Sequence, residues 1–141
     1  MKSIHISFEG IGPVELQKNL VRNYIRDIII SEGFRQGEIS LIFCNDEYLL
    51  DVNRKYLNHD FFTDIITFNY TEDNIISGDL FISIDRVKEN ADQFIVSFNQ
   101  ELMRVVFHGI LHMTGYDDKT EEEKVRMRKR ENDYLEKYDL A

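Results

Sequence analysis

Cysteine is almost absent from the chain, because Cys44 is the only one among 141 residues. A single cysteine allows neither an intrachain disulfide nor a zinc site built from several thiolates, and it suits a reducing compartment. Proline is equally scarce, with Pro13 alone, and the seven glycines are scattered. No segment therefore has the composition of a flexible linker. The length is typical of one domain, and the sequence predicts a single domain over residues 1–141.

Long hydrophobic runs are also missing. The longest aliphatic run covers only residues 28–30, whereas a membrane-spanning helix needs about 20 apolar residues. Residues 1–8 alternate apolar and polar side chains instead of forming the apolar core of a secretory signal. We therefore expect a cytoplasmic protein that does not bind membranes.

Positive charge is in deficit, since 17 lysines and arginines face 26 aspartates and glutamates and give a formal net charge of −9. Broad binding to duplex nucleic acid depends on neutralising phosphates, so this balance disfavours it. A local basic cleft remains compatible with the same composition. The hydrophobic fraction of 43% is sufficient for a globular core.

The pattern of apolar residues predicts strands early in the chain and helices late. Strands are expected at 4–8, 39–43, 65–68 and 80–84, and helices at 13–31, 46–56, 85–96, 99–113 and 120–138. Pro13 is expected to open the first helix, and the polar residues 71–78 to form a loop between two strands. These elements predict an α+β or α/β layered domain around a small mixed sheet.

Two histidines stand four residues apart in segment 102–113, which is apolar almost all round. Residues i and i+4 of an α-helix lie on one face, about 40° apart, so His108 and His112 can bind one ion together. A buried helix offers two imidazoles few other partners, and neutral imidazole is a good ligand for zinc and other transition metals. The pair therefore predicts a metal site.

A third donor follows the helix. Gly115 is typical of the left-handed residue that ends a helix and reverses the chain, and Asp118 lies three residues beyond it. Two histidines and one carboxylate leave coordination positions for water, as a catalytic site requires. Asp117 is a rival donor. In the alternative interpretation both histidines are core residues, and Asp117 or Asp118 only caps the last helix.

The spacing of His108, His112 and Asp118 is metzincin-like, but one peptidase feature is missing. Zinc peptidases with this spacing carry a glutamate directly after the first histidine, where it acts as general base. Gly109 occupies that position here. A metallohydrolase of another kind is therefore favoured over a peptidase.

Residues 108–118, His-Gly-Ile-Leu-His-Met-Thr-Gly-Tyr-Asp-Asp, closely resemble the signature of the YbeY family of small bacterial metal-dependent endoribonucleases. Two further blocks resemble the same family in order and spacing: 52–68, which ends in Thr-Asp-Ile-Ile-Thr-Phe, and 78–83, Gly-Asp-Leu-Phe-Ile-Ser. The resemblance implies an α+β fold with αβα layers and one divalent metal ion, usually zinc, without an organic cofactor. His108 and His112 correspond to the first two ligands.

The resemblance also implies cleavage of single-stranded RNA in rRNA maturation and ribosome quality control, with the ribosome or its small subunit as partner. Two positions depart from the family pattern. Asp118 stands where the third ligand is usually histidine, and its harder oxygen would make Mn²⁺ or Fe²⁺ acceptable beside Zn²⁺. Leu57 stands where the family usually has an arginine that engages phosphate.

Other cations are candidates to replace that arginine. Arg54 and Lys55 adjoin Leu57 and are candidate catalytic residues, although a solvated helix face is the alternative. Segment 124–130 has five basic residues in seven, which either face RNA or pair with the acidic residues 121–123. Two alternatives to the endoribonuclease remain: a ribosome-associated metalloprotein with little nuclease activity, and a metallohydrolase of another substrate class.

Overall fold

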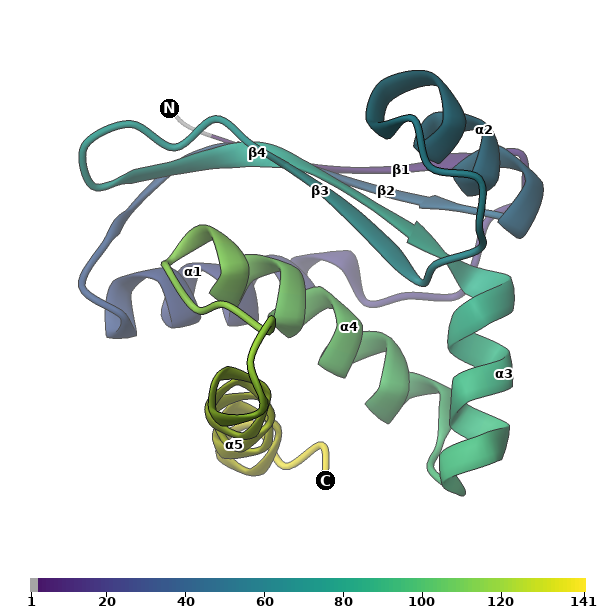
Figure 1. Cartoon of the computed structure of the whole chain (residues 1–141). Helices are drawn as coiled ribbons and strands as arrows, with labels where there is room; N and C mark the ends of the chain where they lie inside the picture. The colour runs from purple at the N-terminus through teal and green to yellow at the C-terminus, as the bar shows by residue number, and fades with distance from the viewer. Residues whose placement is uncertain (1–2) are drawn as a thin grey trace.

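A computed structural model of the chain describes residues 3–141 and shows a four-stranded sheet with helices on both faces (Figure 1). The strand order is β1-β2-β4-β3, in which β1, β2 and β4 run parallel and β3 runs antiparallel to β4. The elements are β1 (Ile4–Glu9), α1 (Lys18–Ser31), β2 (Arg35–Cys44), α2 (Asp46–Leu57), β3 (Ile65–Asn69), β4 (Ile75–Ser83), α3 (Ile84–Phe94), α4 (Phe98–Met113) and α5 (Glu121–Lys137). The predicted α+β fold with αβα layers is confirmed.

The main core lies between the sheet and helices α1 and α4, which cross the same face of the sheet (Figure 1). A smaller apolar cluster under α2 covers the opposite face. Cys44 is fully buried in this smaller cluster, and burial raises the pKa of its thiol to about 12. None of the helices within residues 3–141 has both the length and the apolar character needed to cross a membrane.

The prediction that Pro13 opens a helix is wrong, because α1 begins at Lys18. Residues 11–17 are irregular, and their apolar residues Ile11, Val14 and Leu16 pack against the main core. Tertiary contacts of these three side chains therefore determine the path of the segment. The preference of proline for the first helical turn is a weaker, local effect.

The prediction of a loop at 71–78 is also wrong in its second half, because β4 starts at Ile75. This strand pairs in parallel with β2 on one side and antiparallel with β3 on the other, where Gly78 lies opposite Asn69. Polar composition indicates a loop when only neighbouring residues are considered. Hydrogen bonding along both edges makes this segment a central strand.

Helix α5 packs on α4 and is fixed to the end of α1 by Glu32. Arg130 Nη2 lies 2.6 Å from Glu32 Oε2, and the Tyr134 hydroxyl donates to the same oxygen. Burial alone would raise the pKa of Glu32, but these hydrogen bonds outweigh it and the pKa is lowered. The ionised carboxylate thus holds α5 in place.

We expect Gly78→Ala to destabilise the fold. A Cβ atom at this position would lie 2.3 Å from the carbonyl oxygen of Phe68 and 2.9 Å from Sδ of Met113. The nearer contact is with backbone, so relief requires β3 to move away from β4. The expected loss is about 3 kcal/mol in the free energy of unfolding, measured by urea denaturation. Gly12→Ala is the control, because a Cβ there meets no atom of the described residues within 4 Å. Equal losses would contradict the prediction.

Candidate metal centre

The two histidines of the motif lie on α4, which is buried on most sides. Their rings stand on one side of the helix, with centroids 4.5 Å apart. Gly109 between them faces the sheet, and a Cβ there would lie 2.4 Å from Leu80 Cδ2 and 2.7 Å from Ile65 Cδ1. A side chain at this position would point into the core and away from the histidines, so the close packing of α4 on the sheet accounts for the glycine.

The turn after α4 returns the third donor to the histidines. Gly115 adopts a φ of 108°, and the backbone N–H of Tyr116 donates to the carbonyl oxygen of Leu111. Asp118 Oδ2 consequently lies 3.2 Å from His108 Nε2 and 3.4 Å from His112 Nε2. The reversal inferred from glycine in the sequence is confirmed.

The neighbouring residues exclude the capping interpretation. The N-cap of α5 is Thr120, whose hydroxyl accepts from the Glu123 backbone N–H while the Glu123 carboxylate accepts from the Thr120 N–H. Neither Asp117 nor Asp118 therefore caps the helix. Asp117 lines a different pocket, together with Gly115 and Arg126, and does not join the histidines.

The distances in the cluster suit one metal ion. One atom each from His108, His112 and Asp118 lies within 4.8 Å of the others. Two ligands that each bind a tetrahedral ion at about 2.1 Å are separated by roughly 3.4 Å, close to the 3.2 and 3.4 Å separations from Asp118 Oδ2. The cluster could therefore hold a metal ion, and two imidazoles with one carboxylate suit Zn²⁺, Mn²⁺ or Fe²⁺.

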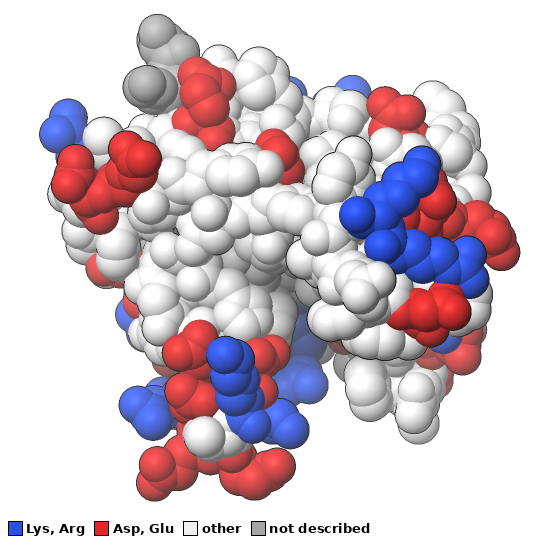
Figure 2. All heavy atoms as spheres, turned by 45° about the horizontal axis from the view of Figure 1, so that its top comes forward, with Lys and Arg blue, Asp and Glu red and all other residues white. Residues whose placement is uncertain are grey.

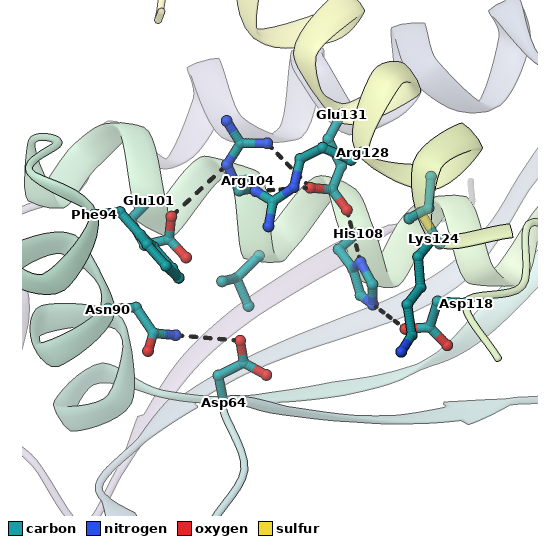
Figure 3. Close-up of a pocket in the computed structure, with 12 residues that line it drawn as sticks. Asp64, Asn90, Phe94, Glu101, Arg104, His108, Asp118, Lys124, Arg128 and Glu131 are labelled. Atoms are coloured by element: carbon teal, nitrogen blue, oxygen red, sulfur yellow. Dashed lines mark hydrogen bonds and ion pairs between the residues drawn. The ribbon is translucent and has the colours of Figure 1, made fainter. Parts of the chain in front are cut away.

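The outer nitrogens of both imidazoles have fixed partners. His108 Nδ1 lies 2.7 Å from Glu131 Oε2, and His112 Nδ1 lies 2.8 Å from the carbonyl oxygen of Tyr116. In the neutral imidazole, an Nδ1–H that donates to these oxygens leaves the Nε2 lone pair free for a metal ion. Figure 3 shows this arrangement for His108, whose Nε2 faces Asp118. Hydrogen bonds of this type orient the histidine ligands of metal sites.

Glu131 contacts the cluster, although it lies outside the sequence motif. Its side chain is buried on α5, and its second oxygen, Oε1, lies 3.1 Å from Arg104 Nη1 (Figure 3). A sequence signal for it does exist. Glu131 lies midway between Met127 and Leu135, two buried positions of the apolar stripe of α5. A carboxylate within such a stripe needs a buried cationic or hydrogen-bonding partner.

Two pockets meet at the histidine–aspartate cluster, and Asp64, His108 and Asp118 line both. The α5-side pocket, of about 400 Å³, extends toward α3 and α5, and the α2-side pocket, of about 520 Å³, extends toward α2 and β3. Figure 2 shows a hollow on the face that joins the sheet and helices, with lysine and arginine atoms visible toward its lower end. The cluster is therefore open to a ligand from two directions.

A model of the family described as "Endoribonuclease YbeY" matches residues 9–139. The chain belongs to the YbeY family. It is 50% identical over 113 residues to the Endoribonuclease YbeY of Flavobacterium psychrophilum, with 80% of this chain and 81% of the relative covered. The Endoribonuclease YbeY of Parabacteroides distasonis is 50% identical over 124 residues, with 88% and 87% covered. The solution structure of TM1509 from Thermotoga maritima, 26% identical, covers 97% of this chain and 92% of its own with a TM-score of 0.66.

The electrostatics of this YbeY-family site follow from burial and close charges. Burial lowers the pKa of His108, but the hydrogen bond to Glu131 and the negative charges of Glu131, Asp118 and Asp64 outweigh it, so the pKa is raised. Burial raises the pKa of Asp64, and the positive charge of His108 offsets this only in part. Perturbed pairs of this kind in a cleft are typical of functional sites.

Leu57, at the position of the family's arginine, and its neighbours Arg54 and Lys55 differ in whether they line a pocket. Leu57 lines the α2-side pocket. Arg54 and Lys55 line neither of the two pockets, because Arg54 is ion-paired with Asp60 and Lys55 Nζ lies 2.9 Å from Asp51 Oδ2 on the exposed face of α2. Their geometry agrees with the solvated-face alternative, and we assign them no catalytic role.

Proposed function

We propose that this YbeY-family protein is a metal-dependent endoribonuclease that cleaves single-stranded RNA in the cytoplasm, with rRNA of the small ribosomal subunit as substrate. The observation that carries the proposal is the convergence of two imidazole nitrogens and a carboxylate oxygen where two pockets meet. Relatives of half-identical sequence, named as endoribonucleases, support the reaction class. An open cleft suits an unpaired strand that can be drawn past the cluster.

In this proposal His108, His112 and Asp118 are the ligands of one divalent ion, with Zn²⁺ expected and Mn²⁺ or Fe²⁺ acceptable because of the carboxylate. When bound, such an ion supplies Lewis acidity toward a phosphodiester oxygen and a water of lowered pKa. Glu131 holds His108 in the orientation that this requires. Asp64 faces both pockets with a raised pKa, so it is placed to take up or release a proton beside the substrate.

We expect Asp118→Ala to lose metal and RNA cleavage together, whereas Asp117→Ala retains both. Removal of one of three ligands should weaken metal binding by at least about 100-fold, more than the loss of an outer hydrogen bond. Asp118→His should retain metal and shift occupancy toward zinc, because it restores a third nitrogen. Element analysis of the purified variants gives the metal content, and labelled single-stranded RNA with a matched duplex gives the activity.

Three results would each contradict a different part of the proposal. If the losses follow Asp117, the third ligand is misassigned. If the metal-loaded wild type cleaves neither the single strand nor the duplex, the proposed reaction is wrong. If the wild type cleaves RNA equally well after chelation and element analysis finds no metal, the metal dependence is wrong.

A further inference from the structure

The cations around the metal-ligand cluster all lie on one side of it. Within the part of the chain that the structure describes, the lysines and arginines that line either pocket are Arg104, Lys124 and Arg128, and all three line the α5-side pocket. The α2-side pocket, which contains Leu57, is lined by no lysine or arginine among these residues. A phosphate held near the cluster therefore finds its side-chain cations on the α5 side.

Glu131 does not need Arg128 as a partner, because each of its two carboxylate oxygens already has a closer one. Its Nη1 lies 3.8 Å from Glu131 Oε1, beyond hydrogen-bond distance, while Arg104 Nη1 lies 3.1 Å from the same oxygen. The other oxygen of Glu131 is paired with His108. The Arg128 side chain is 54% exposed and lines the pocket, so its guanidinium can bind an anion without leaving a buried charge unpaired (Figure 3).

Lys124 adds a second cation one helical turn before Arg128, on the same side of α5. Its only ion pair in the described residues is to Glu121, at 3.6 Å, and the Glu121 side chain is 92% exposed. Exposed pairs of this kind are weak and exchange readily for a stronger partner. Figure 3 shows the Lys124 side chain extending beside Asp118, at the mouth of the cluster.

The other basic residues near this segment have structural partners, except Arg126, which lines a different pocket with Asp117. Arg104 is 14% exposed and lies between Glu101 and Glu131, so it serves as the buried counter-ion of Glu131. Arg130 is paired with Glu32, and Lys129 with Asp133. The basic residues of α5 therefore lie on different faces of the helix, and of these Lys124 and Arg128 face the cluster.

We propose that Arg128 and Lys124 form a phosphate subsite that binds the RNA strand on the α5 side of the metal-ligand cluster. The subsite takes over the role of the cation that is absent at Leu57. A guanidinium can hold a phosphate through two parallel hydrogen bonds, and an ammonium one turn away adds a point charge. This inference rests on the proposed endoribonuclease function, and it places part of the bound strand on the α5 side of the cluster.

The test compares the proposed pair of cations with a matched pair on α2 that lines neither pocket. Arg128→Gln/Lys124→Gln removes the proposed subsite, and Arg54→Gln/Lys55→Gln removes the same charge from α2, on the side of Leu57. All four side chains are at least half exposed, so both double variants should fold. Binding is measured by fluorescence anisotropy at several salt concentrations, with the metal-loaded protein and a single-stranded RNA whose 2′-hydroxyls are methylated to prevent cleavage.

We expect the α5 double variant to bind this RNA at least about tenfold more weakly and to retain its full metal content. The slope of log Kd against log salt should fall by roughly 1.4, because the variant removes two cationic contacts and each contact to a single strand contributes about 0.7. The α2 double variant should change Kd by less than about twofold. Leu57→Arg added to the α5 double variant should restore part of the affinity, because it returns a cation to the cleft.

Equal losses in the two double variants, or an unchanged Kd in the α5 variant, would overturn the subsite. Cleavage of unmodified RNA by the wild type is measured in parallel and tests the proposed function separately. If the wild type cleaves RNA and the α5 double variant binds RNA as tightly as the wild type, the proposed subsite is wrong but the proposed endoribonuclease function is supported. A wild type that neither binds nor cleaves RNA overturns both.

Discussion

Replacement of both His108 and His112 by alanine is expected to reduce bound metal to background and to abolish RNA cleavage. The two Nε2 atoms supply two of the three ligand atoms in the cluster, and their loss leaves Asp118, a partly buried carboxylate, as the one remaining ligand of the three. The melting temperature should also lose its dependence on metal, because a ligand that binds only the folded state stabilises it by about 2.7 kcal/mol at 100 times its Kd.

The measurement combines element analysis with thermal unfolding before and after chelation. Chelated wild type is the proper reference for stability, because the double substitution also removes imidazole packing and the hydrogen bond of His108 to Glu131. His5→Ala is the matched control, since His5 is exposed on β1 and pairs only with Glu38 among the described residues. A double variant that keeps its metal content would disprove the ligand assignment.

Glu131→Ala is expected to lower both the stability of the fold and the metal affinity. The side chain is 5% exposed, and its oxygens lie 3.1 Å from Arg104 Nη1 and 2.7 Å from His108 Nδ1. Among residues 3–141, its removal leaves the Arg104 guanidinium with the 3.7 Å contact to Glu101 as its one ion pair. Breaking a buried ion pair in this way costs about 3–5 kcal/mol in the free energy of unfolding. Metal affinity should fall by about 10- to 100-fold, because His108 loses the hydrogen bond that orients it.

Urea denaturation and metal titration measure the two effects separately. Glu136→Ala, an exposed glutamate on the same helix, should change stability by less than about 0.5 kcal/mol. Glu131→Gln keeps the shape but can offer only one carbonyl oxygen to the two donors, so it should give an intermediate loss of metal affinity. If Glu131→Ala resembles Glu136→Ala in both measurements, Glu131 has no positioning role.

The sequence by itself determined the local part of the site. Helical geometry places His108 and His112 on one face whatever surrounds them, because residues i and i+4 are always one turn apart. The left-handed conformation of Gly115 returns Asp118 within a few residues, since few other residues adopt a φ of 108° at low cost. The order of strands and helices followed in the same way from residue periodicity.

Only the tertiary structure decided the contacts between distant segments. Sequence periodicity shows which face of α5 is apolar, but not that Glu131 on that face meets His108, 23 residues earlier. The path around Pro13 and the extent of β4 depended on the core and on pairing with both neighbouring strands. The selection of Lys124 and Arg128 from five basic residues required the docking of α5 on α4. Such contacts are set by the packing of whole elements, and no spacing along the chain encodes them locally.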